Sequence, residues 1–447
     1  MSIACLKGAA RFCSITGSAS SIIAPKTKVI VLGGTSHLAG SIVHRALELG
    51  YSVIGTSRAV DFKGLKPSGN LDLVHIPADR VTDVATWKKF AESKIFFGDR
   101  VLVVNAMGGA HCEALETLET KNIDPVVAAL EGIQSVAKVR ALEKFHFLNL
   151  SSLAAEICSE SGYGKAKKEC DSILLEKGPE DMTILRVSYA VNPPARGGGT
   201  NSVSDEHWYS VDQLATLPFQ IVLGDKDVPM QPVALSDIAD VACNSLFFKG
   251  KETVYAVGPQ IVSQMYFAKF FANVLGKKFN PLFVDSKVGA LLAKHFSKGH
   301  FSSYAIEAIN KGGIVRDPGP FELRKGSPLL TLEDQYKIKD GEEISIVALP
   351  IIAHLRESIK KVFTNPEVAR DTFSATRIFL ADKFVGLRPG VFSAWVQAAF
   401  EALCRIGPST SVTKDGVSYR VKIVAKDDFN KTARLNANKF AKSITKS

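Results

Sequence analysis

Residues 28–50 have the sequence KVIVLGGTSHLAGSIVHRALELG, and the fold prediction starts from them. The first five residues form a short, β-branched apolar run, which is typical of a buried strand in a parallel sheet. A glycine-containing turn follows, and apolar residues then recur at helical spacing up to Gly50, a natural helix stop. This order predicts a strand, a tight turn and a helix whose N-terminal N–H groups point at a bound phosphate.

The turn between this strand and helix is the first candidate binding site. Aligned on its last glycine, it has a histidine where the dinucleotide-binding fingerprint has its middle glycine. The residues predicted to hold a pyrophosphate are Gly34, Thr35, Ser36, His37, Leu38 and Gly40. The competing interpretation is a tight turn without a ligand, in which the His37 ring fills the phosphate position.

Further strand-like runs follow at the spacing of a repeated strand–helix unit. Apolar, β-branched segments occupy residues 52–56, 71–76, 100–104, 145–150 and 183–187. Segments of helical composition, such as 124–140, separate them. Strands that alternate with helices predict an α/β fold with a doubly wound parallel sheet. Right-handed crossovers then place the carboxyl ends of all strands at one edge, which is where a ligand binds.

Residues after the predicted strands indicate which dinucleotide binds. Ser57 and Arg58 follow the second strand, where an acidic side chain would select the ribose 2′-hydroxyl of NAD. Because the Arg58 guanidinium pairs instead with a 2′-phosphate, we expect NADP(H); the alternative is a solvated arginine. Asp79, after the third strand, is expected to touch the adenine edge. The fourth strand is followed by the last candidates of this kind, Asn105, Ala106 and Met107.

A catalytic-looking set follows the fifth predicted strand. Ser151 comes directly after that strand, and Tyr163 and Lys167 are four residues apart on one face of the next predicted helix. The lysine ammonium favours the phenolate, so the tyrosine can exchange a proton with a carbonyl or alcohol oxygen that Ser151 holds. A nicotinamide would carry the hydride, and Tyr163 and Lys167 are expected to contact it. The competing interpretation is a tyrosine that packs a helix beside exposed lysines.

These motifs resemble the short-chain dehydrogenase/reductase superfamily, in its atypical or extended type, from residue 28 to about residue 330. Later landmarks agree, namely LRVS (185–188), QPVALSDIA (231–239) and VYAVGP (254–259). The resemblance implies a Rossmann-type sheet with a small substrate-side lobe. It also implies a nicotinamide cofactor and the serine, tyrosine and lysine above as the catalytic set.

Shorter stretches are similar to the dehydrogenase-like, NADPH-binding accessory subunits of mitochondrial respiratory complex I (NADH:ubiquinone oxidoreductase). They are IVLG (221–224), VGP (257–259) ahead of an aromatic helix at 265–275, and residues 321–329. This resemblance implies a tightly held, structural NADP(H), no established turnover, and a peripheral place on the matrix side of the inner membrane. The aromatic helix would contact neighbouring subunits and lipid; an equally weighted alternative makes its side chains ordinary core.

Two other functions stay open. The Ser–Tyr–Lys set is compatible with an active NADPH-dependent reductase or epimerase. The net charge of +10 is compatible with a structural protein of an organellar ribosome or RNA complex. Nucleic acid is the less expected partner, because only Tyr419, Phe429 and Phe440 accompany the basic C-terminal tail and offer surfaces for base stacking.

Charge and composition narrow the class of protein. The first acidic residue is Glu48, and residues 1–25 are basic and rich in Ser and Ala. This is typical of a mitochondrial or plastid transit peptide, or of a disordered basic arm. The seven cysteines include no C-x-x-C pair, so we expect neither a disulfide scaffold nor a metal site. The apolar run at 346–353 is far shorter than the roughly 20 residues that span a membrane.

The expected division is a transit-like segment (1–25), a dinucleotide-binding domain (26–330) and a mixed helical extension with a basic tail (331–447). In the extension, residues 344–363 and 392–404 predict helices, and Gly416 predicts a hairpin between 411–413 and 417–425. From Lys414 to the end there are nine basic and three acidic residues. Such a tail suits anionic lipid head groups or an acidic partner.

Overall fold

The structure is a computed structural model that describes residues 27–34, 37–58, 68–109, 115–160, 162–191, 195–196, 220–285, 310–315, 317–347 and 409–424. Several predicted features lie outside these ranges. They are Thr35, Ser36, residues 1–25, residues 348–363, the helix at 392–404 and the tail from 425. Within the described ranges, every helix is too short or too polar to cross a bilayer.

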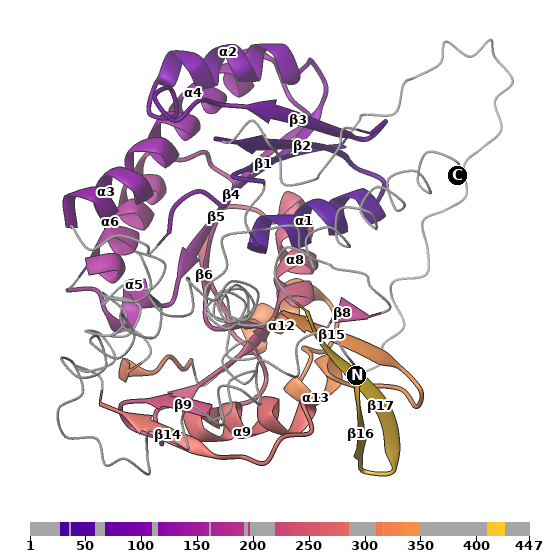
Figure 1. Cartoon of the computed structure of the whole chain (residues 1–447). Helices are drawn as coiled ribbons and strands as arrows, with labels where there is room; N and C mark the ends of the chain where they lie inside the picture. The colour runs from indigo at the N-terminus through magenta and orange to yellow at the C-terminus, as the bar shows by residue number, and fades with distance from the viewer. Residues whose placement is uncertain are drawn as a thin grey trace, which may run out of the picture.

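A seven-stranded sheet, parallel at every pairing, forms the centre of the fold (Figure 1). Its order is β12-β6-β5-β4-β1-β2-β3. The strands are β1 (Thr27–Leu32), β2 (Ser52–Ser57), β3 (Leu71–His75), β4 (Arg100–Asn105), β5 (Lys144–Ser152), β6 (Met182–Val187) and β12 (Lys251–Ala256). The order turns back beside β1, which confirms the predicted doubly wound sheet.

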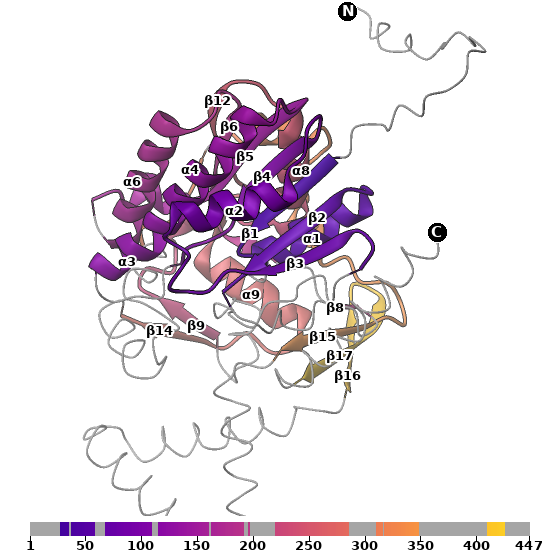
Figure 2. The same ribbon diagram turned by 90° about the horizontal axis from the view of Figure 1, so that it is seen from above.

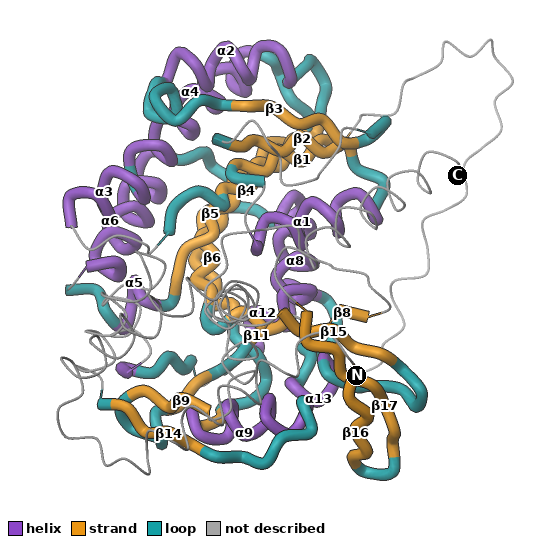
Figure 3. The backbone as a smooth tube through the Cα atoms, in the orientation of Figure 1, coloured by secondary structure: helices purple, strands orange, loops and turns teal. Residues whose placement is uncertain are grey.

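Helices cover both faces of this sheet (Figure 3). Val29 and Val31 of β1 pack with α1 (His37–Glu48) and α8 (Leu235–Asn244). Ile30 and Leu32 face the opposite side, toward the layer that contains α2 (Val84–Lys94), α4 (Asp124–Val139) and α6 (Gly162–Lys177). All four side chains are fully buried, which explains why β1 is apolar without alternation.

A smaller lobe lies to one side of the sheet (Figure 2). Its elements are β9 (Gln220–Leu223), β10 (Pro229–Met230), β13 (Val262–Ser263), α9 (Gln264–Val274), β14 (Pro281–Val284), α13 (Leu332–Gln335), β15 (Glu343–Val347), β16 (Ser409–Lys414), β17 (Val417–Val424) and β8 (Ala195–Arg196). The remaining described elements are α3 (Leu115–Asn122), α5 (Ala154–Ile157), β7 (Ala190–Val191), β11 (Val233–Ala234), η1 (Ser245–Phe247) and α12 (Gly319–Lys325).

The aromatic helix predicted at 265–275 is α9, but its phenylalanines are core. Phe267, Phe270 and Phe271 are at most 7% exposed, and the rings of Phe270 and Phe271 meet Tyr336 edge to face. The expectation that this aromatic face contacts neighbouring subunits or lipid is therefore wrong for these three side chains. They fill the core of the lobe, and Tyr266 is the exposed aromatic residue of the helix.

The C-terminal part joins the lobe as sheet. A helix beginning at Ile344 is wrong for the described residues, because Glu343–Val347 is β15, parallel to β17 and antiparallel to β8. The segment EISIV alternates polar and apolar side chains and buries Ile344 completely, as a strand requires. The hairpin is confirmed: β16 pairs antiparallel with β17 through Asp415 and Gly416, which both have positive φ.

Candidate dinucleotide site

The predicted site residues gather at the carboxyl edge of the sheet. The register places Leu32, Asn105 and Asn149 side by side on β1, β4 and β5. The loops after β1, β2, β4 and β5 therefore leave from the same edge. Four separate stretches of candidate residues meet there, as expected for a ligand that lies across the strand ends.

The glycine turn after β1 packs tightly against β2. Gly33 has φ +75° and donates its N–H to Thr56 Oγ1 at 3.2 Å, and Gly34 donates to the Thr56 carbonyl at 2.8 Å. A Cβ at Gly34 would lie 3.0 Å from the Cα of Gly55, so this glycine allows turn and strand to approach. Helix α1 begins at His37 and has no acidic residue in its first turn, which leaves its N-terminus attractive to an anion.

The remaining candidate residues of the turn after β1 show less about a ligand. Gly40 is buried in α1, and Leu38 is partly buried against the α1–α8 cluster. Thr35, Ser36 and the side chain of His37 lie outside the described part of the chain. Whether the His37 ring covers a phosphate or fills its position therefore stays a prediction.

The second strand ends with one buried and one exposed candidate. Ser57 is 5% exposed, and its carbonyl accepts from the N–H of Ile76. Arg58 is exposed, and the structure pairs its guanidinium with no described carboxylate. Asp79 is also exposed and lies 3.7 Å from Arg80. Arg58 is thus available for a phosphate, whereas Asp79 has a neighbouring cation.

The loop after β4 is held from inside the protein. Asn105 is fully buried; its Oδ1 accepts from the N–H of Met107 at 3.1 Å, and its Nδ2 donates to Asn149 Oδ1 at 2.7 Å. Ala106 and Met107 are partly buried. Asn122, which the sequence did not single out, is fully buried and bonds both the N–H and the carbonyl of Gly109. The buried side chains of Asn105 and Asn122 therefore fix the backbone of the loop after β4 by hydrogen bonds.

Tyr163 and Lys167 share a face of α6, as predicted. The Lys167 ammonium lies 5.7 Å from the centre of the Tyr163 ring, and the lysine is only 4% exposed. It would lie 3.1 Å from a Cβ at Gly108, where φ is +106°, so the glycine loop leaves room for it. No acceptor among the described residues takes a hydrogen bond from this ammonium. An ammonium on a largely buried lysine, with no acceptor among the described residues, fits a ligand that supplies the acceptor.

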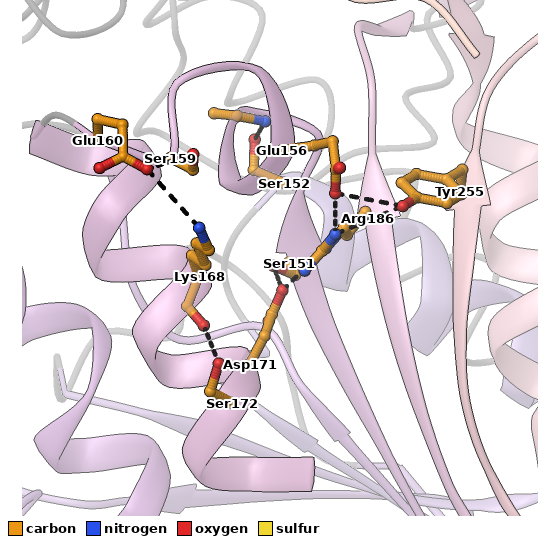
Figure 4. A network of polar contacts seen from close by, with 11 residues as sticks. Ser151, Ser152, Glu156, Ser159, Glu160, Lys168, Asp171, Ser172, Arg186 and Tyr255 are labelled. Atoms are coloured by element: carbon orange, nitrogen blue, oxygen red, sulfur yellow. Dashed lines mark hydrogen bonds and ion pairs between the residues drawn. The ribbon is translucent and has the colours of Figure 1, made fainter.

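Ser151 lies within β5 at this edge, two residues beyond Asn149, but its side chain is buried. It is 6% exposed, and its hydroxyl donates to Asp171 Oδ2 at 2.9 Å (Figure 4). Asn149 Nδ2 donates to Asp171 Oδ1 and Arg186 Nε to Asp171 Oδ2, each at 3.1 Å. Burial raises the pKa of Asp171, while the hydrogen bonds from Ser151 and Arg186 oppose that rise. Its carboxylate is almost fully buried and accepts three hydrogen bonds.

The same network continues to the surface through residues that the sequence analysis missed. Arg186 pairs with Glu156 of α5 and lies 5.9 Å from the ring centre of Tyr255, whose hydroxyl donates to Glu156 at 3.3 Å. Figure 4 shows this path from Ser151 to Tyr255. The available signal was the helical spacing, since Asp171 follows Lys167 by four residues. Among the described residues, no cluster of His, Cys, Asp and Glu is arranged to hold a metal ion.

Comparisons with known proteins confirm the fold. No protein-family model matches the sequence, and no curated protein sequence matches it. The crystal structure of WbmG from Bordetella bronchiseptica in complex with NAD and UDP is similar, with a TM-score of 0.50 and 13% identity over 69% of this chain and 91% of that chain. The dTDP-glucose 4,6-dehydratase of Bacillus anthracis in complex with NAD gives a TM-score of 0.51 and 12% identity over 69% and 93%. The chain shares with these two structures a Rossmann-type fold, a parallel sheet flanked by helices.

Proposed function

We propose that this protein binds NADP(H) at the carboxyl edge of its sheet and holds it as a structural group. In this proposal the chain is a short-chain dehydrogenase/reductase homologue that serves as an accessory subunit of mitochondrial complex I, on the matrix side of the inner membrane. The observation that carries it is the contrast between two side chains. Lys167 is only 4% exposed, and no described residue accepts a hydrogen bond from its ammonium, whereas the Ser151 hydroxyl is already bonded to Asp171.

The first half of the contrast supports nucleotide binding. A lysine that is 4% exposed needs acceptors, and a ribose carries hydroxyl oxygens that provide them. Arg58 is exposed after β2 without a described carboxylate partner, and in this proposal it pairs with the additional phosphate of NADP(H). The nicotinamide would supply hydride chemistry if a substrate reached it, and Lys167 and Arg58 would hold its nucleotide portion.

The second half supports a structural role. A serine that assists carbonyl reduction must donate its hydrogen bond to the substrate oxygen, but the proton of Ser151 is used in its bond to Asp171. A tightly bound nucleotide nevertheless stabilises a protein by mass action. The complex I assignment itself rests on the sequence resemblance and on the transit-like residues 1–25.

A turnover assay tests the structural role. The purified protein is incubated with NADPH and a panel of aldehydes, ketones and nucleotide sugars, and absorbance at the nicotinamide band is followed. We expect oxidation no faster than in buffer. Substrate-dependent oxidation that disappears in Tyr163→Phe would contradict the proposal. Native gel electrophoresis of mitochondrial membranes tests the assembly, because the protein should migrate with complex I and not as a free monomer.

An active NADPH-dependent reductase or epimerase is the second candidate. It is favoured by the closeness of the Lys167 ammonium to the Tyr163 ring, 5.7 Å from its centre, because that pair is the proton-transfer part of the set. The same turnover assay separates the two candidates.

A further inference from the structure

The turn between α2 and β4 exposes two neighbouring phenylalanines at the amino edge of the sheet, opposite the candidate site. Phe96 is 52% exposed and Phe97 is 80% exposed. Neither ring belongs to the hydrophobic clusters of the sheet faces or of the small lobe. Single exposed apolar side chains are ordinary on a protein surface, but two adjacent aromatic rings at the tip of a turn indicate a contact surface.

Buried groups hold the backbone of this turn in place. Asp99 Oδ2 accepts hydrogen bonds from the N–H of Phe96 at 2.7 Å and from Lys28 Nζ at 2.6 Å, and both charged residues are 7% exposed. The N–H of Glu143 donates to the Asp99 carbonyl oxygen at 3.0 Å. Gly98, with φ +74°, turns the chain directly after the two rings. A hydrogen-bonded frame therefore presents both phenylalanines.

The C-terminal end of α4 brings a third exposed apolar side chain to the turn. Helices α2 and α4 both run from the carboxyl edge to the amino edge of the sheet, and a Cβ at Gly132 would lie 2.8 Å from the backbone nitrogen of Lys88. Because equal numbers of residues cover equal lengths of helix, Val139 is level with Ile95, which directly precedes the turn. Val139 is 83% exposed.

Positive charge accompanies these apolar side chains. Lys138 and Arg140 flank Val139, and neither is paired with a carboxylate among the described residues. The other cations of this corner are paired, namely Lys28 with Asp99, Lys94 with Asp72 and Arg100 with Glu143. The corner therefore has an excess of positive charge. We call the surface formed by Phe96, Phe97, Lys138, Val139 and Arg140 the edge patch.

We infer that the edge patch docks on an anionic lipid surface. In this contact the two rings enter the boundary between head groups and acyl chains, and the Lys138 and Arg140 charges meet lipid phosphates. Charge complementarity favours this occupant, because the excess charge is positive and lies beside the apolar tip. A protein partner fits less well, since three apolar side chains form a small core for an interface that buries about 800 Å² on each side. The inference goes beyond the proposed function and needs neither a bound nucleotide nor complex I.

Flotation with lipid vesicles tests the contribution of the rings. The protein is mixed with vesicles of phosphatidylcholine that contain about 30 mol% phosphatidylglycerol, and the bound fraction is measured against lipid concentration. We expect Phe97→Ala to weaken binding by roughly tenfold, because an aromatic ring no longer enters the lipid. Phe283→Ala, at a 53% exposed phenylalanine of β14 in the small lobe, is the matched control and should bind like the wild type. No binding by the wild type, or equal binding by Phe97→Ala, overturns the inference.

The same assay tests the charges. The double variant Lys138→Gln/Arg140→Gln should weaken binding to these vesicles by about fivefold per charge and leave binding to pure phosphatidylcholine nearly unchanged. Arg420→Gln/Lys422→Gln removes as much charge from β17 in the small lobe and is the control. If the control weakens binding as strongly, the vesicles respond to the net charge of the protein and the inference fails.

Tryptophan quenching separates a lipid contact from a protein contact. Phe97→Trp and Phe283→Trp each add one indole to the same chain, and lipids with brominated acyl chains quench an indole that enters the bilayer. We expect more quenching than in the wild type for Phe97→Trp and no increase for Phe283→Trp. Equal quenching of the two variants contradicts the inference. If Phe97→Trp is not quenched, while Phe97→Ala detaches the protein from complex I on native gels, the partner is a protein and the lipid contact is wrong.

Discussion

The hydroxyl of Tyr419 donates a buried hydrogen bond to the carbonyl oxygen of Val274 at 3.0 Å and so joins the C-terminal hairpin to the end of α9. Around it, Val412, Tyr419 and Val421 share one hydrophobic cluster with the phenylalanines of α9. Residues 409–424 are therefore part of the core of the lobe, although 145 positions separate the two partners of this bond in the sequence.

Removing this hydroxyl should weaken the lobe measurably. Tyr419→Phe keeps the ring and leaves the Val274 carbonyl without its donor, so we expect a loss of about 1 kcal/mol in the free energy of unfolding. Tyr419→Ala should cost about 3–5 kcal/mol, because it also empties the ring's place in the cluster. Denaturant unfolding measures both, and Ser411→Ala, at an exposed position of the same hairpin, is the matched control. Equal stability of Tyr419→Ala and the control would show that the hairpin is not part of the core.

Stability should depend on pH through His146. This histidine is fully buried on β5, and burial lowers its pKa from 6.5 to about 4. The unfolded chain therefore binds a proton between about pH 6.5 and 4 that the folded chain does not, so the free energy of unfolding falls as pH decreases through this window.

The slope should approach about 1.4 kcal/mol per pH unit for this one group. His146→Gln removes the titration and should reduce the pH dependence between pH 6.5 and 4, whereas the exposed His75→Gln should leave it unchanged. Unfolding curves at pH 6.5, 5.5 and 4.5 give the comparison. An unchanged slope in His146→Gln would mean that the folded protein accepts the proton.

We expect that Gly34 cannot be replaced by a larger residue without loss of stability, because there is no room for a side chain. A Cβ there meets the Gly55 Cα at 3.0 Å and the Val31 carbonyl at 3.3 Å, so Gly34→Ala must push the turn away from β2. We expect a cost of about 1–3 kcal/mol in stability together with weaker NADPH binding.

Gly50→Ala is the control for this change. Gly50 has φ +76° but open space around it, and it precedes β2 at the amino edge, opposite the candidate site. It should lower stability through backbone strain and leave nucleotide affinity unchanged. Equal effects of both changes on NADPH affinity would argue against a phosphate site at the turn.

Arg58 should set the preference for NADPH. Its loss removes a charge-assisted contact with the 2′-phosphate, so Arg58→Ala should weaken NADPH binding by roughly 10- to 100-fold and leave NADH binding nearly unchanged. Titration of both nucleotides gives the ratio. Arg80→Ala, at an exposed arginine on the neighbouring loop, is the control. If Arg58→Ala weakens both nucleotides equally, the guanidinium does not read the 2′-phosphate.

The positions of the strands and helices could be predicted from the local sequence pattern. The hydrogen-bond network inside the protein could not. The strands β1 to β6 were predicted to within two residues because each is a short apolar run that the parallel sheet buries on both faces. The same reasoning failed at Ile344, since apolar spacing over 344–363 favours a helix whereas β15 exists only because β8 and β17 lie on either side of it.

In the candidate site, too, some residue pairs could be predicted from the sequence and others could not. Tyr163 and Lys167 were paired correctly from their spacing on one helix. The partner of Ser151 was not, because Asp171 reaches it from a helix 20 residues away and Arg186 joins from the next strand. Contacts of that kind depend on how α6 packs on β5 and β6, which periodicity does not encode.

The central claim is that the carboxyl edge of the sheet holds NADP(H). Its most direct test is mass spectrometry of the small molecules released when natively purified protein is denatured. The account predicts NADP(H) at close to one molecule per chain, and its loss from Arg58→Ala prepared in the same way. Protein that is folded and yet releases no dinucleotide, or releases only NAD(H), would contradict it.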